Sequence, residues 1–509
     1  MAFERIQFDK LKDKVKTTEQ AVAFFKDGMT VGASGFTKSG DSKVVLPALA
    51  ERAKKEDIKI TLVTGASLGH DTDGKLAEAG VLHKRMPFQV DRTLRKKINN
   101  GEILFTDPHL SESVELLHNK TMSLDLAVIE AAYIDRDGNI IPTTSVGNSV
   151  TFAQFAKKVI IEINTSVQPD IYGIHDIYQA EDYPFRNVIP IVAPWNKIGR
   201  RTIKLDPEKV EAIVFTDIRD SPADIAEPDE KTQAIAKHIL DFFEKKVQQG
   251  KLTERLLPLQ AGIGKVANAV LTGFKDSNFY DLTMFSEVLQ DSTFDLMDAG
   301  KLSFASASSI TVSDACYDRV FNNLNQYRDK IVLRPQNISN TPGLIRRLGI
   351  IAINTAIEFD IYGNVNSTHI SGTNIMNGIG GSGDFARNAY LSIFVTQAAS
   401  KENTISHVLP MVSHVDHTEH DVDVLVTDVG LADLRGLAPR ERAQAIIDNC
   451  VHPEYKEELQ SYFDRACQRG GHTPHILEEA LSWHIRFKEQ KTMKKTTEER
   501  AIENNMINS

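Results

Sequence analysis

Glu287 is the residue of this sequence best placed to act as a nucleophile. It follows the apolar stretch 282–285, which has the pattern of a β-strand, within the segment MFSEVLQD. A carboxylate in such a place is usually a solvated surface group, so a catalytic role requires neighbours that stabilise an oxyanion. Asn340, in an amide-rich turn, and the unhindered N–H groups of the glycine run GIGGSG at 378–383 are suitable. This combination predicts covalent catalysis by a carboxylate.

The same glycine run fits G-x-G-x-x-G through Gly378, Gly380 and Gly383, which is the pattern of a dinucleotide-binding loop. Such a loop follows directly on a strand and has an acidic residue near the next strand. Residues 371–377 are polar and loop-like, and the motif lies in the third quarter of the chain. A dinucleotide-dependent dehydrogenase is therefore the less favoured interpretation.

Residues 65–69 (GASLG) fit the G-x-S-x-G turn of serine hydrolases, and a strand-like segment precedes them. A helix should begin promptly after such a turn, but the sequence continues with HDTDG. We therefore interpret Ser67 as part of a structural turn, with a nucleophilic serine as the alternative.

Three histidines, His414, His417 and His420, recur at intervals of three residues in SHVDHTEHD, a spacing that can place metal ligands on one helical face. The next residues, 421–427, alternate as in a strand instead. The sequence favours a buried polar turn near the ligand cleft, and we predict no metal site.

The two halves of the chain resemble each other. VIEAAYIDRDGNI at 128–140 corresponds to INTAIEFDIYGNV at 353–365, each a strand pattern followed by an Asp-x-x-Gly-Asn turn. GNSVTFA at 147–153 corresponds to GGSGDFA at 380–386, and each leads into a strand-like stretch. Residues 60–65 correspond to 282–287, so the first half has Gly65 where the second has Glu287. The repeat predicts an ancient duplication.

Apolar strands alternate with helical segments in both halves, which predicts two similar open α/β domains, largely parallel sheets and an active site in the cleft between them. A capping-box pattern at Thr17 and Gln20 predicts a helix that ends near Gly28. A second helix, over 231–249, should bury Ile235, Ile239, Phe242 and Phe243.

Residues 217–230 are rich in proline and acidic residues and are typical of an exposed linker. We place the first domain at 1–220, the linker at 221–230, the second domain at 231–493 and a loose, charged tail at 494–509.

The composition limits the partners of the 509-residue chain. A net charge of -10 argues against nucleic-acid binding. Three cysteines without a CxxC pair indicate a reducing compartment. The N-terminus lacks a signal-peptide pattern, and no apolar run approaches the ~20 residues that span a bilayer. We expect a soluble, cytoplasmic protein without membrane association, and an organellar matrix is the alternative location.

Several segments resemble the acetyl-CoA hydrolase/transferase family, and within it the succinyl-CoA:acetate CoA-transferases. The resemblance extends over roughly residues 10–493. It is carried by SGFTKSGDSKVV near Gly35, FSEVLQD at Glu287, RPQNISN ending at Asn340, the segment from Asp360 to Tyr390, and HVDHTEHDVDVLVTDVGLADLRGL from His414.

The resemblance implies that Glu287 forms acyl-anhydride and glutamyl-CoA thioester intermediates, while Asn340 and the Gly381 amide bind the oxyanion. It also implies CoA-binding positions, which are Gln260, Ala261, Gly262, Ile263, Gly264, Asn377, Gly381 and Lys401. Lys265 departs from the family, which usually has Asn or Ser there, and Asn337 stands where relatives often have Glu.

The expected reaction moves CoA from an acyl-CoA to a carboxylate by a ping-pong mechanism. Succinyl-CoA with acetate is the first expectation, propionyl-CoA with succinate the second, and hydrolysis by the same glutamate is the alternative. A catalytically silent acyl-CoA sensor would have no reason to retain the carboxylate. Because one CoA ester replaces another almost isoenergetically, we expect CoA as a substrate and no permanently bound cofactor. The expected partners are acyl-CoA, small carboxylates and a second copy of the chain in a homodimer.

Overall fold

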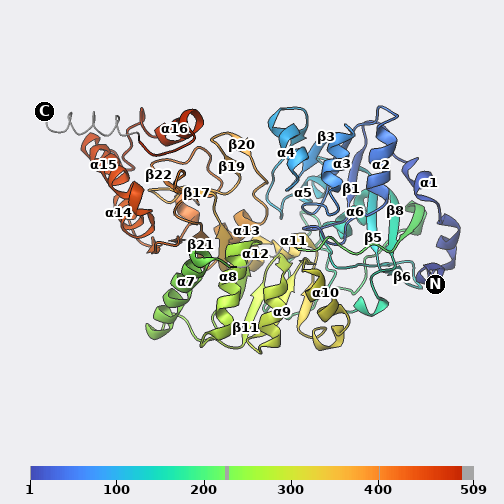
Figure 1. Cartoon of the computed structure of the whole chain (residues 1–509). Coiled ribbons are helices and arrows are strands. Elements are labelled where there is room, and N and C mark those ends of the chain that lie inside the picture. Colours follow the sequence, from blue (N-terminus) through green and yellow to red (C-terminus); the bar gives the residue numbers. More distant parts are fainter. Residues whose placement is uncertain (1, 224–227, 401, 496–509) are drawn as a thin grey trace.

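The computed structural model describes residues 2–223, 228–400 and 402–495. It contains two large β-sheets whose strands follow the same order (Figure 1). The first sheet has the order β4-β3-β2-β1-β5-β8-β9, and the second has β15-β13-β11-β10-β16-β21-β23-β24. All pairs are parallel except the extra edge pair β23–β24. The matching order confirms two similar α/β halves.

The strands of the first sheet are β1 (Thr30–Ala33), β2 (Ile60–Val63), β3 (Leu82–Met86), β4 (Leu104–Phe105), β5 (Leu124–Ala131), β8 (Ala156–Asn164) and β9 (Val210–Thr216). Those of the second are β10 (Leu259–Ala261), β11 (Leu282–Phe285), β13 (Leu302–Ala307), β15 (Ile331–Leu333), β16 (Ile351–Thr355), β21 (Leu391–Val395), β23 (Val424–Val426) and β24 (Leu431–Asp433).

Corresponding helices connect corresponding strands, as parallel sheets require. In the first half these are α2 (Val45–Ala53), α3 (Thr72–Glu78) and α4 (Arg92–Asn99), and in the second α8 (Lys265–Gly273), α9 (Asp291–Asp298) and α10 (Asp314–Phe321). The two G-x-S-x-x-F-A motifs form α6 (Ser149–Phe155) and α13 (Ser382–Asn388), which lead into β8 and β21 as predicted.

The duplicated Asp-x-x-Gly-Asn segments form the same turn in both halves. Asp135 Oδ1 accepts the Asn139 N–H at 2.8 Å, and Asp360 Oδ1 accepts the Asn364 N–H at 3.1 Å. The first turn joins β6 (Tyr133–Ile134) to β7 (Ile140–Ile141), and the second joins β17 (Glu358–Asp360) to β18 (Val365–Asn366).

The predicted ends agree with the observed ends for one helix, α7 (Glu230–Gln248), and disagree for another, α1 (Thr18–Val22). α7 buries the four expected apolar residues, and Asp229 caps it through the Thr232 N–H. α1 has the predicted Thr17–Gln20 capping box but ends well before Gly28. The chain turns early because Phe25 packs into the core with no exposed surface, and Gly28, at φ 78°, bonds to the Lys59 carbonyl.

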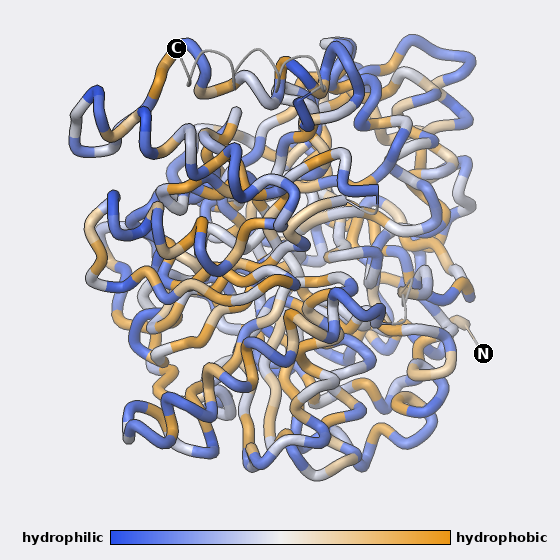
Figure 2. Tube along the Cα trace, turned by 60° about the vertical axis from the view of Figure 1, so that its left-hand side comes forward, coloured by the Kyte–Doolittle hydropathy of each residue, from blue (hydrophilic) through white to orange (hydrophobic). Residues whose placement is uncertain are grey.

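One hydrophobic core runs through both halves and contains residues of both sheets, including Ile129, Met284 and Ile353. Figure 2 shows apolar segments concentrated in the interior and hydrophilic segments in the outer turns. The helices α14 (Pro439–Cys450), α15 (Pro453–Arg469) and α16 (Ser482–Gln490) form a separate core with β17 and β22 (Val408–Leu409), seen in orange and red in Figure 1.

The described residues also form shorter elements. They are α5 (Glu115–His118), α11 (Gln336–Ser339), α12 (Pro342–Leu348), β12 (Val288–Leu289), β14 (Ser309–Ile310), β19 (His369–Ile370), β20 (Asn374–Ile375) and seven short 3-10 turns.

Three sequence-based assignments fall partly or wholly outside the described residues: Lys401, positions 224–227 of the linker and positions 496–509 of the tail. The domain boundaries therefore stay predictions. No helix within the described ranges is long and apolar enough to cross a membrane.

Candidate active site

The catalytic candidates lie where the two halves meet. Backbone hydrogen bonds cross this junction from Val146 N to the Ser308 carbonyl, from Ile310 N to the Thr144 carbonyl and from Gln336 N to the Gly147 carbonyl, each at 2.9 Å. The loops after β2 and β11 both reach this region, because the carboxyl ends of parallel strands carry the ligand-binding loops of open α/β sheets.

Gly65 and Glu287, the corresponding residues after β2 and β11, have different neighbours. A Cβ atom at position 65 would lie 2.6 Å from the Gly35 carbonyl oxygen and 2.9 Å from Gln336 Oε1. Gly65 therefore lets the start of α11, which leads to Asn340, approach the first half closely. At position 287 the second half instead presents a carboxyl group.

Backbone hydrogen bonds hold Glu287 in place, and its carboxyl group points toward the site. Its carbonyl oxygen accepts the Ser308 and Ser309 N–H groups at 2.8 and 3.1 Å. The residue is 9% exposed, and its Oε1 has no hydrogen-bond partner among the described residues. A methyl group built on Gly381 would overlap that Oε1, so backbone and carboxyl group are in close approach.

Burial and, to a smaller extent, the charge of Asp384 together raise the pKa of Glu287 to about 8, against the lowering effect of a hydrogen bond from Gln260. At neutral pH the group is therefore largely protonated in the free enzyme. A carboxylate of raised pKa is also a stronger nucleophile than an ordinary one once it is ionised. Perturbed carboxyl groups in clefts are frequent at catalytic sites.

We expect this pKa to appear in the rate of reaction with acyl-CoA. Glu287 must be ionised to attack, so kcat/KM, which reports the free enzyme, should fall about tenfold per pH unit below about pH 8. Initial rates measured between about pH 5 and pH 9.5 test this. An acidic limb near 4.5, the ordinary value, would contradict it.

Asn340 lies beside Glu287, but the NH2 group of its amide, which would bind an oxyanion, points away from the site. It is fully buried at the end of α11, and its Nδ2 donates to the Gln336 carbonyl at 3.3 Å. Its Oδ1, 2.6 Å from a Cβ built on Gly381, faces the site and has no partner among the described residues. A half-turn of the amide would present the NH2 group that an oxyanion needs.

Residues 378–384, here called the glycine loop, owe their glycines to close packing. A Cβ on Gly378 would lie 2.8 Å from Asp107 Oδ1, and one on Gly383 would overlap the His109 ring. The hairpin strand β20, which belongs to neither large sheet, precedes the loop. The arrangement is therefore not the strand–loop–helix of a dinucleotide site.

A cavity of about 170 Å³, here called the catalytic cavity, contains Glu287 and is lined by both halves. The first half contributes Phe36, Thr37, Ala66, Phe88 and Leu110, and the second contributes Gly262, Ile263, Asn354, Ser367 and the glycine loop. A second cavity of about 370 Å³ shares Thr37, Phe88, Ile263, Val288 and Asn377 with it. The two cavities therefore adjoin.

The residues expected to bind CoA fall into two groups. Gly262, Ile263, Gly264, Asn377 and Gly381 line these two cavities. Gln260 and Ala261 lie in the buried strand β10, where Gln260 Nε2 donates to Asn354 Oδ1 at 3.1 Å. Lys265 lines the larger cavity and pairs with Asp229 at 2.7 Å.

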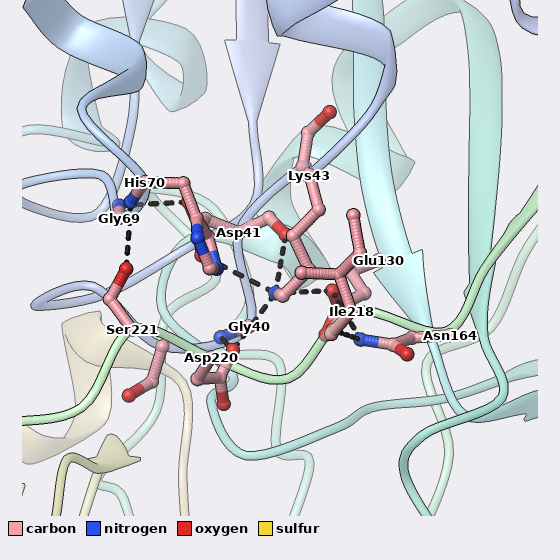
Figure 3. Close-up of polar contacts among 12 residues, drawn as sticks. Gly40, Asp41, Lys43, Gly69, His70, Glu130, Asn164, Ile218, Asp220 and Ser221 are labelled. Atoms are coloured by element: carbon pink, nitrogen blue, oxygen red, sulfur yellow. Dashed lines mark hydrogen bonds and ion pairs between the residues drawn. The ribbon is translucent and has the colours of Figure 1, made fainter.

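A cluster of buried charged groups surrounds Lys43, and Figure 3 shows this side chain together with Asp41, Glu130 and Asp220. Lys43 Nζ lies 2.6 Å from Glu130 Oε2 and 2.8 Å from Asp220 Oδ1. Burial opposes the charge of Lys43, but Asp220, Glu130 and Asp41 outweigh it and raise its pKa well above the usual value. The expectation of an exposed stretch from 217 is thus wrong for Asp220, because this buried amine needs a compensating charge.

The serine motif at 65–69 and the histidine motif at 414–420 lie in different surroundings. Ser67 is buried in a turn, and its carbonyl accepts the Lys38 N–H at 2.9 Å. His417 is buried, and its Nε2 lies 3.2 Å from Ser367 Oγ and 3.1 Å from Ser382 Oγ, both in the catalytic cavity. The His420 side chain is 82% exposed. No group of three potential metal-binding side chains occurs within the described part of the chain.

Four residues at the glycine loop were not predicted from the sequence: Asp107, His109 and Ser111, which lie against the loop, and Asp384, which is part of it. Asp384 could have been found, because the aligned motifs GNSVTFA and GGSGDFA place Thr151 opposite it. The comparison that singled out Glu287 thus also reveals a second acidic residue specific to the second half. The other three lie in a segment without a recognisable motif.

Comparisons with known proteins agree with this architecture. Residues 4–215 match the acetyl-CoA hydrolase/transferase N-terminal domain, and residues 317–463 match the corresponding C-terminal domain. The chain therefore belongs to the acetyl-CoA hydrolase/transferase family.

Two relatives are similar over nearly the full length. The succinyl-CoA:acetate CoA-transferase of Clostridium kluyveri is 49% identical over 495 residues, 96% of this chain and 92% of that protein. The acetyl-CoA hydrolase of Candida glabrata is 45% identical over 512 residues, covering 96% and 97%. The chain is thus an enzyme of this family, whose activity is the transfer or the hydrolysis of a CoA thioester.

Two solved structures share the fold. RipA from Yersinia pestis has a TM-score of 0.71 at 21% identity and covers 90% of this chain and 99% of its own. The 4-hydroxybutyrate CoA-transferase of Porphyromonas gingivalis has a TM-score of 0.62 at 19% identity, with the same coverage.

Proposed function

We propose that this enzyme is a CoA-transferase that moves CoA from an acyl-CoA to a free carboxylate through Glu287. One observation carries the proposal: a buried carboxyl group without a partner for its Oε1 among the described residues lies against Gly381 in a cavity between the halves. Burying such a group costs stability, so its presence indicates a chemical role.

The reaction has two half-reactions with Glu287 as carrier. The Glu287 carboxylate attacks the acyl carbon, and the carbon–sulfur bond breaks. CoA thiolate is released, and Glu287 is left as an acyl-glutamyl anhydride. The thiolate then attacks the Glu287 carbonyl carbon, and the donor carboxylate departs, which leaves a glutamyl-CoA thioester. The acceptor carboxylate then attacks the glutamyl-CoA thioester and releases CoA thiolate, which attacks the acceptor's acyl carbon in the new anhydride. This step forms the product acyl-CoA and regenerates the Glu287 carboxylate without net proton uptake.

Both attacks place negative charge on a carbonyl oxygen. The Gly381 N–H, and Asn340 after its amide turns, are the donors we assign to that charge. The two adjoining cavities, lined by Gly262, Ile263, Gly264 and Asn377, are the path we assign to CoA, whose binding energy from remote contacts can be applied at the reacting centre.

Succinyl-CoA as donor and acetate as acceptor are the substrates we propose first. The support is the similarity to the Clostridium kluyveri enzyme and the volume of the catalytic cavity, about 170 Å³, which suits a short acyl group. Hydrolysis is the second candidate, because relatives at 44% and 45% identity are acetyl-CoA hydrolases. A homodimer and a cytoplasmic location stay predictions.

The decisive experiment incubates the enzyme with succinyl-CoA alone. We expect the intact mass to increase by the mass of one CoA less one water, with the modification on the peptide around Glu287. Thiol release should remain a small fraction of the exchange rate with acetate. Steady-state plots for both substrates should be parallel, as in ping-pong transfer. Equal thiol release with and without acetate, and no adduct, would instead make the enzyme a hydrolase.

A further inference from the structure

Residues 107–111 of the first half, here called the docking segment, contact the glycine loop at both ends. Asp107 accepts the Ile379 N–H with its two carboxylate oxygens, at 3.0 and 2.9 Å. Ser111 donates to Asp384 through its N–H at 2.9 Å and its hydroxyl at 2.5 Å. The residues joined are more than 270 positions apart, so these bonds fasten one half of the chain to the other.

The space between these two contacts is filled. The His109 ring lies where a side chain on Gly383 would be, and Asp107 Oδ1 lies where one on Gly378 would be. Asp384 is 4% exposed, so its bonds to Ser111 are shielded from water. Gly381, between the two contacts, is thereby held against Glu287.

The docking segment also separates two cavities. Leu110 lines the catalytic cavity, whereas the next residue, Ser111, lines an outer cavity of about 620 Å³ together with Glu112, Arg186 and Arg347. The outer cavity reaches solvent, because Tyr183 and Val188 in its lining are 74% and 76% exposed. A gap between the docking segment and the glycine loop would therefore lead water toward Glu287.

We propose that Asp107 and Ser111 are positioning residues that seal the glycine loop over Glu287 and so set the partition of the glutamyl-CoA thioester between a carboxylate acceptor and water. This inference rests on the proposed covalent function. In the water branch, a water oxygen bonds to the Glu287 carbonyl carbon and the carbon–sulfur bond breaks. One water proton ends on the CoA thiol, the other is released, and the Glu287 carboxylate is restored.

The test compares the ratio of acceptor-independent thiol release to acetate exchange in purified variants. In Asp107→Ala we expect this ratio to rise about tenfold or more, because the Ile379 N–H loses its acceptor and the loop loosens. Asp107→Asn keeps one acceptor oxygen and should recover much of the wild-type ratio. Ser111→Ala loses the hydroxyl contact but keeps the N–H contact, so a smaller rise is expected.

The matched control is Asp27→Ala. Asp27 also accepts a backbone N–H, that of Lys59 at 2.8 Å, but it lines neither cavity. The ratio should stay at the wild-type value in this variant. KM for acyl-CoA should change little in all variants, because the CoA path is not altered.

A purely structural role for Asp107 would lower hydrolysis and exchange by the same factor, and an unchanged ratio in folded Asp107→Ala overturns the proposal. If that variant does not fold, Ser111→Ala decides in the same way, since an unchanged ratio there also overturns it. Wild-type enzyme that shows no acetate-dependent exchange would refute the proposed function instead, so the two failures are distinguishable.

Discussion

Glu287→Ala is expected to abolish CoA exchange, by about 10⁴-fold or more, in a protein that remains folded. The substitution removes the only group we assign to forming the covalent intermediate. It leaves the backbone bonds to Ser308 and Ser309 in place, because the Glu287 carbonyl oxygen makes them. Exchange rates with succinyl-CoA and acetate, with circular dichroism as the folding check, measure the effect. Substantial exchange in the alanine variant would end the case for Glu287.

Glu287→Asp should also lose most activity, by about 100-fold, because the shorter side chain withdraws the nucleophile from Gly381. Glu287→Gln is the isosteric control and should be inactive but not less stable. The pKa of Glu287 is raised to about 8 in the folded protein from 4.5, so the folded state binds more protons between these values. The contribution of Glu287 to stability therefore falls as the pH rises through this window.

A glutamine does not titrate, so Glu287→Gln should gain stability relative to wild type as the pH increases from about 5 to 9. The gain should reach about 1–4 kcal/mol in the free energy of unfolding, for a group that is fully buried. Urea unfolding at both pH values measures it. A difference that does not depend on pH would show that Glu287 is not protonated in the folded protein at neutral pH.

Gly381→Ala is expected to lower kcat for exchange by about 100- to 1,000-fold, the range typical of losing an oxyanion donor. The added methyl group would overlap Glu287 Oε1 and approach Asn340 Oδ1, so the nucleophile, the loop or both must move. The KM for acyl-CoA should change much less than kcat. Stopped-flow measurement of the first half-reaction would locate the loss in the chemical steps.

Gly343→Ala is the matched control for this substitution. Gly343 lies in α12, has no heavy atom within 4 Å of a Cβ built on it, and does not have a positive φ. Its alanine variant should retain exchange within about twofold of wild type. A Gly381→Ala enzyme that is as active as this control would show that the loop does not stabilise the reacting groups.

Comparison of the two halves of the sequence pointed to the candidate site because duplicated strands end at equivalent places. The Gly65–Glu287 difference pointed to the candidate nucleophile, and the Thr151–Asp384 difference contained a neighbour whose charge raises the pKa of Glu287. The bounds predicted for helix α7 were right to within one residue, because its apolar period matches the face that the structure buries. Helix α1 was predicted too long, because burial of Phe25 outweighs the local helical pattern.

The sequence by itself thus determined the α/β class, the duplication, the family resemblance and the candidate nucleophile, since all of these are written in local periodicity, turn residues and repeated motifs. Only the tertiary structure decided which way the Asn340 amide faces, that Asp220 joins a buried cluster with Lys43, and that Asp107 and Ser111 hold the glycine loop. The Asp220–Lys43 pair and the contacts of Asp107 and Ser111 depend on packing between segments distant in the chain, whereas the Asn340 amide bonds to Gln336 four residues earlier. A side chain's partner across such an interface is set by the geometry of both sheets, which no local pattern encodes.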